Sequence, residues 1–155
     1  MMVLMSKQSG NTVPKQCIAA KAIIKNKEGK ILVLRQSYEK TVDGAGQYHP
    51  PGGIVEPGET LHETIKREVM EETNLQIEIR KLLSVEEWHV NIRGDDCYFV
   101  GVFFECGLKG GNFNTDNIET SGFAWIGPDD IDKYEILQPS KKVIAEVLAG
   151  HLNQG

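Results

Sequence analysis

The stretch Gly53–Leu75, GIVEPGETLHETIKREVMEETNL, decides most of what can be inferred about this chain. Thr60 followed by Glu63 is a capping-box pattern, which predicts that a helix begins at about Leu61 and runs to Thr73. Apolar residues recur at helical spacing along one side of this helix, and that side should face a sheet. They are Leu61, Ile65 and Val69.

Three carboxylates fall near the end of the same predicted helix: Glu68, Glu71 and Glu72. At about 100° per residue they share one sector, where they repel each other and face the negative end of the helix dipole. No lysine or arginine lies in the last turn to offset these penalties. A solvated acidic face would leave them uncompensated, whereas a hard cation such as Mg²⁺ or Mn²⁺ would reverse them. The pattern therefore predicts a divalent metal site.

Glycines precede the acidic helix at Gly52, Gly53 and Gly58. A backbone without side chains can turn tightly and approach a ligand closely, so Gly52 and Gly53 are candidates for ligand contact. Asn74 follows the helix, and asparagine is the best residue after glycine for a left-handed cap.

This stretch resembles the signature of the Nudix hydrolase family: Gly, five residues, Glu, seven residues, Arg-Glu, an aliphatic, any residue, Glu-Glu, any residue, Gly, an aliphatic. The matching positions are Gly53, Glu59, Arg67, Glu68, Val69, Glu71, Glu72 and Leu75. Asn74 stands where the signature has glycine, which should affect the helix cap and leave the acidic residues untouched.

The resemblance implies an α/β (α+β) fold, an α/β/α sandwich with a mixed sheet between helices. It also implies a metal-dependent hydrolase of nucleoside diphosphates linked to another group. Glu68 and Glu72 are then expected to be metal ligands, with Glu71 a ligand or nearby base and the carbonyl of Gly52 a further ligand. Arg67 and Glu59 are expected to form an internal ion pair.

Three further residues are candidates outside the signature. Related enzymes often supply another glutamate, as base or metal ligand, from the region of Glu119, although a surface loop glutamate is an equal alternative. Arg35 and His49 are candidates for contact with a substrate phosphate. The alternatives are an exposed strand residue for Arg35 and a locally hydrogen-bonded loop histidine for His49.

Substrate class follows only by elimination. No proline occurs between Pro57 and Pro128, whereas ADP-ribose hydrolases of the family tend to carry one shortly after the signature. The first tyrosine after the signature is Tyr98, late for a dinucleoside polyphosphate hydrolase. A (d)NTP pyrophosphatase that gives NMP and pyrophosphate is the best expectation. The alternatives are another diphosphate (a nucleotide sugar, ADP-ribose or capped RNA) and a non-catalytic module that senses nucleotides.

Composition bounds the class of protein. The 155 residues suffice for one domain, expected at 15–155 after an arm at 1–14, and the net charge of −5 disfavours nucleic-acid and membrane-surface partners. An anionic substrate approaching this charge needs a metal or a local basic pocket. Three cysteines without CxxC spacing indicate a reducing, cytoplasmic setting. The expected partner is a small-molecule nucleotide, and homodimers are common in the family.

Sequence patterns also predict the order of elements. Strands are expected at 16–25, 30–36, 76–89, 97–105 and 123–126. A short helical turn is expected at 128–132, a helix at 139–149, a rigid elbow at 49–53, and loops at 37–47 and 107–122. The sum is one sheet with a helix on each side.

Overall fold

The computed structural model describes residues 13–37, 46–92, 94–116 and 120–151. Its strands are β1 (Lys15–Lys25), β2 (Ile31–Gln36), β3 (Tyr48–His49), β4 (Gly52–Ile54), β5 (Leu75–Ile92), β6 (Asp95–Gly111) and β7 (Thr120–Ile126). Its helices are α1 (Leu61–Thr73) and α2 (Ser140–Leu148). Residues 1–12 of the predicted arm lie outside the described residues.

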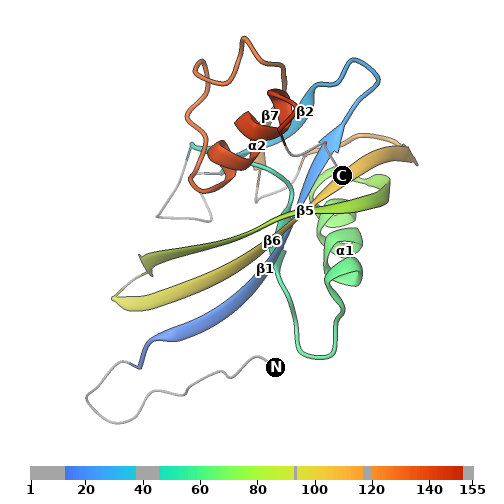
Figure 1. Cartoon of the computed structure of the whole chain (residues 1–155). Helices are drawn as coiled ribbons and strands as arrows, with labels where there is room; N and C mark the ends of the chain where they lie inside the picture. The colour runs from blue at the N-terminus through green and yellow to red at the C-terminus, as the bar shows by residue number, and fades with distance from the viewer. Residues whose placement is uncertain (1–12, 38–45, 93, 117–119, 152–155) are drawn as a thin grey trace.

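All seven strands belong to one sheet built around β1 (Figure 1). The strand order is β3-β2-β1-β6-β5, with β4 paired to β1 and β7 paired to β2. β1 and β6 run parallel, whereas β1 pairs antiparallel with both β2 and β4. The sheet is therefore mixed, as expected.

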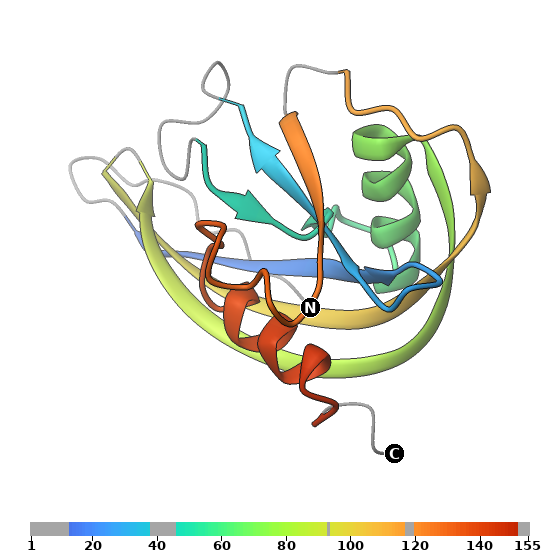
Figure 2. The same cartoon turned by 90° about the horizontal axis from the view of Figure 1, so that it is seen from above.

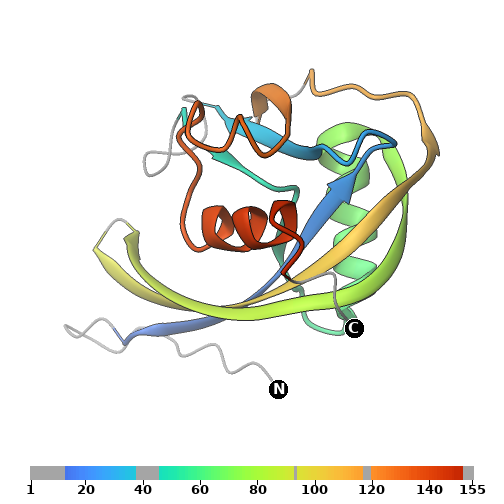
Figure 3. The same ribbon diagram turned by 45° about the horizontal axis from the view of Figure 1, so that its top comes forward.

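The two helices cover opposite faces of this sheet, because successive side chains of a strand point to opposite faces. Ala22 and Ile24 of β1 belong to the apolar cluster that contains Ile65 and Val69 of α1. Ile23, between them, belongs to the cluster that contains residues of α2. Figures 2 and 3 show α2 inside the curve of the long β5–β6 ribbon, with α1 on the other side of β1. The expected helix on each side of one sheet is confirmed.

Helix α1 has the bounds that the capping pattern predicts. The hydroxyl oxygen of Thr60 accepts a hydrogen bond from the backbone N–H of Glu63 at 3.1 Å. Asn74 ends the helix in the left-handed conformation at φ 59°, and its N–H donates to the carbonyl of Met70 at 2.9 Å. Asn74 therefore caps the helix in the left-handed conformation, as the glycine of the family signature would.

Two expectations about loops are wrong. The loop predicted from 107 begins only after Gly111, because β6 continues to pair with β5 as far as Leu75 and Gly111. β7 begins at Thr120, inside the same predicted loop, and β4 begins at Gly52, inside the predicted elbow. Ladder hydrogen bonds join main-chain groups, so strands can extend through glycine-rich and polar sequence when a partner strand lies alongside.

In the parts of the chain that the structure describes, neither helix is long and apolar enough to cross a membrane.

Candidate active site

The acidic end of α1 meets the glycines of β4. Glu72 is 4% exposed, and its Oε1 accepts a hydrogen bond from the N–H of Gly52 at 3.0 Å. Glu68 lies one turn earlier, where a Cβ on Gly53 would come within 2.5 Å of its carboxyl carbon. Glycine at position 53 is therefore what lets the Glu68 carboxylate reach the backbone of β4.

Gly52 is required for a different reason. Its φ is 151°, and a Cβ there would collide with the backbone carbonyl oxygen of Ala20 on β1. This glycine allows β4 to pair closely with β1, which fixes the N–H that binds Glu72. Gly52 thus allows β4 to pair with β1, and Gly53 allows the Glu68 carboxylate to approach β4.

Arg67 organises the outer part of the site. Its Nε donates to Glu59 Oε2 at 2.7 Å and its Nη2 donates to Glu59 Oε1 at 2.9 Å, which confirms the ion pair expected from the sequence. Its Nη1 also donates to Glu68 at 2.9 Å and to Glu71 at 3.5 Å. Hydrogen bonds from Arg67 lower the pKa of Glu59 to about 2. The guanidinium is therefore held by Glu59 while it positions Glu68.

A second cation, Lys21 of β1, also faces the carboxylates. Burial lowers the pKa of Lys21, and the charges of Glu72 and Glu68 oppose this shift because they favour the protonated form. Sequence reasoning missed this residue. The available signal was a single charge inside an otherwise apolar strand, AAKAII at 19–24. No basic residue lies in the last turn of α1, as expected, but Arg67 and Lys21 offset the acidic cluster from outside that turn.

The three glutamates are not equivalent. The Glu71 side chain is 55% exposed, whereas that of Glu68 is 16% exposed and Glu72 is buried. Within the described ranges, no three acidic, histidine or cysteine side chains converge as a metal-binding group. Glu119 lies outside the described residues. Mg²⁺ needs only one or two protein carboxylates because water and substrate phosphates supply its other ligands. Glu68 and Glu72, hard oxygen donors gathered at the glycines of β4, fit that requirement.

A cavity of about 480 Å³ opens beside this acidic end and has Lys21 and Gly53 in its wall. Trp88 and Phe99 contribute stacked rings, with centroids 5.1 Å apart and planes 4° apart. Neutral polar side chains make up much of the rest of the lining: Gln36, Gln47, Asn91, Gln138 and Ser140. Sequence reasoning did not select any of these polar residues, because they come from separate strands, from the segments before β3 and α2, and from the first residue of α2.

His49 also lines the cavity, in the locally hydrogen-bonded state that was its alternative. The residue is 8% exposed, and its Nδ1 lies 2.9 Å from the carbonyl oxygen of Pro50. Burial, with a further contribution from Lys21, lowers the pKa of His49 to about 3. A neutral ring that donates from Nδ1 leaves Nε2 as an acceptor. That nitrogen suits a hydroxyl or an N–H of a ligand rather than a phosphate oxygen.

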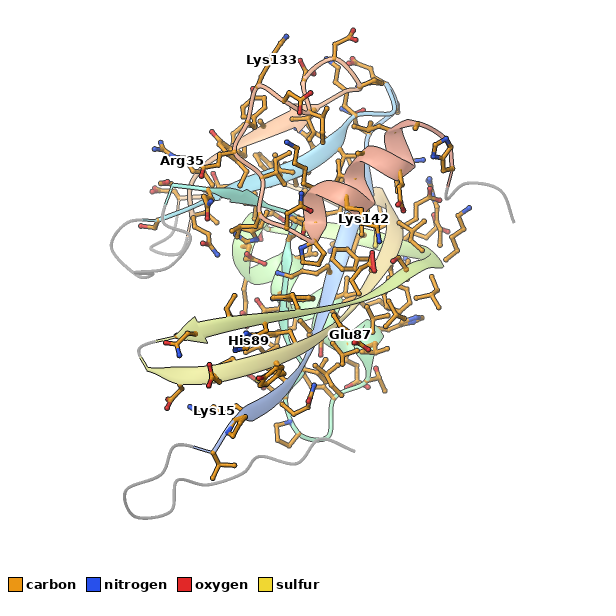
Figure 4. All side chains as sticks on the ribbon, turned by 60° about the vertical axis from the view of Figure 1, so that its left-hand side comes forward. Lys15, Arg35, Glu87, His89, Lys133 and Lys142 are labelled. Carbon is orange, nitrogen blue, oxygen red and sulfur yellow. The ribbon has the colours of Figure 1, made fainter. Side chains whose placement is uncertain are left out.

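Arg35 does not belong to the described residues that line the cavity. Its Nε donates to the carbonyl of Gly46 at 3.4 Å, and Figure 4 shows Arg35 at the outer edge of the molecule. Contact between Arg35 and a substrate therefore stays a prediction.

Comparisons with known proteins agree with this geometry. The NUDIX domain model matches residues 15–147. A MutT-like protein of Streptomyces ambofaciens is 27% identical over 134 residues, which cover 86% of this chain and 79% of that protein. The nucleoside triphosphatase NudI of Escherichia coli O1:K1 / APEC is 26% identical over 127 residues, covering 76% of this chain and 86% of that protein.

The fold itself has been seen before. The crystal structure of a MutT protein from Methanosarcina mazei Go1 matches with a TM-score of 0.76 at 25% identity, covering 92% of this chain and 98% of that one. Since the family model spans residues 15–147 and the signature glutamates meet the glycines of β4, this chain belongs to the Nudix family of hydrolases, which act on phosphoric anhydride bonds.

Proposed function

We propose that this protein is a (d)NTP pyrophosphatase that uses Mg²⁺, or Mn²⁺ in its place, and releases a nucleoside monophosphate and pyrophosphate. The observation that carries the proposal is the position of the cavity, which shares Gly53 with the site of Glu68 and Glu72. A nucleotide can therefore place its base in the cavity and its phosphate chain at the carboxylates.

The cavity has the character of a nucleobase pocket. Its volume of about 480 Å³ lies within the ~300–1,000 Å³ typical of small-molecule sites. The parallel rings of Trp88 and Phe99 offer an aromatic surface, and the amides offer both donors and acceptors. The Oε1 atom of Gln36 is buried without a hydrogen-bond partner among the described residues. A donor on a bound base or sugar would satisfy this amide.

We infer a role for each carboxylate at the end of the site that would hold the phosphate chain. Glu72 and Glu68 would hold the divalent metal on which Nudix hydrolases generally depend, with the Gly52 carbonyl as a further ligand. A bound divalent cation supplies phosphate orientation, charge neutralisation and activation of water. The exposed carboxylate of Glu71 is able to accept the proton of the attacking water, and Glu119 remains a second candidate for that role. Arg67 keeps Glu68 in place.

A nucleoside triphosphate substrate is supported by the NudI relative, which is named a nucleoside triphosphatase, whereas one structural neighbour is named a UDP-X diphosphatase. A sensing module without activity is disfavoured, since this chain keeps every glutamate of the signature. Water attacks the α- or the β-phosphorus, so a new P–O bond forms as the bridging P–O bond breaks. The products are the nucleoside monophosphate and pyrophosphate, and the proton of the water passes to the base.

A hydrolysis screen with Mg²⁺ and with Mn²⁺ tests the proposal. The panel holds common and oxidised (d)NTPs, ADP-ribose, nucleotide sugars and dinucleoside polyphosphates, with phosphate and pyrophosphate detected separately. We expect pyrophosphate from at least one triphosphate. Glu72→Gln is the control, because glutamine can still accept the Gly52 N–H while the charge is lost. We expect its turnover to fall by at least about 100-fold. Turnover confined to ADP-ribose or nucleotide sugars would refute the triphosphate assignment.

A further inference from the structure

Lys21 stands alone as a charge in the buried middle of β1. Its neighbours Ala20 and Ala22 are both 0% exposed, and the strand pairs on both sides, with Gly52 of β4 and with Phe103 of β6. A charged group in such a place is unfavourable unless other groups compensate it. Its side chain therefore has to end beside opposite charge or beside a ligand.

The path of the side chain shows where it ends. The Cδ of Lys21 lies 2.9 Å from the point that a Cβ on Gly52 would occupy, so the stem runs directly over this glycine. Beyond Gly52 are Glu72 and Glu68, whose charges act on the ammonium. Lys21 also lines the cavity beside His49 and Gly53. The ammonium is thus placed where the carboxylates meet the cavity.

Lys21 differs from the other cation at the site in how firmly it is held. Arg67 is held by two hydrogen bonds to Glu59 and lies within 3.7 Å of Glu56, so it cannot leave the outer side of the site without breaking them. Lysine carries a compact charge on a flexible four-carbon stem, whereas the arginine guanidinium is a rigid fork of donors. The ammonium can therefore change position more easily than the guanidinium. Lys21 is therefore the cation that can move when a second cation arrives.

We propose that Lys21 couples metal binding to phosphate binding: its ammonium compensates Glu72 and Glu68 when no metal is bound, and contacts the phosphate chain when a metal takes these carboxylates. The inference rests on the proposed function only for the identity of the phosphate compound. Two cations cannot share the same carboxylates without repulsion, so metal binding drives the ammonium towards the cavity. An ammonium group donates strong, charge-assisted hydrogen bonds to phosphate oxygens. Lys21 thus supplies the basic pocket that an acidic protein needs for an anionic substrate.

The test uses two probes that contain no nucleoside. Mn²⁺ alone is titrated into the protein and followed by electron paramagnetic resonance, and inorganic pyrophosphate is titrated by calorimetry at saturating Mn²⁺. In Lys21→Met we expect Mn²⁺ to bind about fivefold more tightly and pyrophosphate about tenfold more weakly. Lys15→Met is the matched control, because Lys15 lies on the same strand at the far end shown in Figure 4, paired with Asp95 at 3.2 Å.

The opposite changes in affinity for Mn²⁺ and for pyrophosphate distinguish this role from a purely structural role of Lys21. A Lys21→Met protein that binds both probes more weakly, or both within twofold of the wild type, overturns the proposal. Lys21→Arg keeps the charge and should bind Mn²⁺ within twofold of the wild type, even if the methionine variant fails to fold. A fivefold gain in Lys21→Arg would show that side-chain shape sets the affinity, which also overturns it. The Mn²⁺ result stands whether or not any triphosphate is hydrolysed, so this proposal and the proposed function fail separately.

Discussion

Replacing Gly53 by alanine adds one methyl group at the point where α1 approaches β4. The new Cβ would lie 2.5 Å from the carboxyl carbon of Glu68 and 2.5 and 2.9 Å from its two oxygens. Gly53 is not among the residues with positive φ, so alanine fits the backbone itself. The substitution therefore acts on the Glu68 carboxylate and leaves the strand pairing of β4 in place.

The effects of Gly53→Ala on stability and activity depend on how far the Glu68 side chain has to move. Glu68 is the end of a flexible side chain, so it can swing aside at a stability cost of about 1 kcal/mol, at the low end for overpacking. For a chain of this size that lowers Tm by roughly 3 °C. The same shift takes the carboxylate about 1 Å from its place and breaks its 2.9 Å bond to Arg67. A displacement of that size in a catalytic constellation lowers kcat/KM on the order of 100-fold.

Two glycine controls make this prediction specific. Gly122→Ala should be neutral in both assays, because its Cβ meets only the Cβ of Arg35 at 3.9 Å. Gly52→Ala should instead lower Tm strongly, since its Cβ collides with the backbone of Ala20. Pyrophosphate release and a thermal melt are measured for all three variants. A folded Gly53→Ala protein with more than half of the wild-type kcat/KM would refute the role given to this close approach.

Three further outcomes follow from the site. Trp88→Leu removes the stacked ring but keeps an apolar side chain, so KM for the triphosphate should rise about tenfold with kcat within about threefold. Because the pKa of His49 is lowered to about 3, the unfolded chain binds a proton between about pH 3 and 6.5 that the folded protein does not. Unfolding free energy should therefore fall as pH falls through this window, by about 2 kcal/mol at pH 5, and His49→Gln should remove that part in urea titrations. Arg67 lowers the pKa of Glu59 to about 2. The ionised Glu59 therefore stabilises the folded protein fully above about pH 4.5, and this contribution to the unfolding free energy is lost as pH falls through 2. A Glu59→Gln protein should lose less stability than the wild type over that interval, and equal losses would contradict the assignment.

The local features of the site were predictable because they depend on near neighbours in the chain. The capping box of Thr60 and Glu63 set the start of α1, and the helical spacing of Ile65 and Val69 set the face that packs on the sheet. The ion pair of Arg67 with Glu59 was expected from the resemblance and is present. The capping contact, the spacing of the two apolar residues and the ion pair each span eight residues or fewer, so the sequence shows each of them in one short stretch.

Contacts between distant strands were not predictable in the same way. Lys21 lies 51 positions before Glu72, and Trp88 faces Phe99 only because β5 and β6 pair in one register (Trp88↔Phe99). A register shift of one residue would turn Trp88 to the other face of the ribbon. The length of β6 was missed for the same reason, since pairing with β5 and not side-chain polarity carries it to Gly111.

The sequence by itself therefore determined the family, the helix and the glutamates that it carries, because helix capping and a 23-residue signature are written in consecutive residues. Only the tertiary structure decided which of those glutamates is buried, which cations offset them and where a substrate can sit. Glu72 is buried beside β4, which donates the Gly52 N–H to it. Its charge acts on Lys21 because β1 pairs with β4 at the same glycine. These relations depend on the packing of separate elements, which no local pattern encodes.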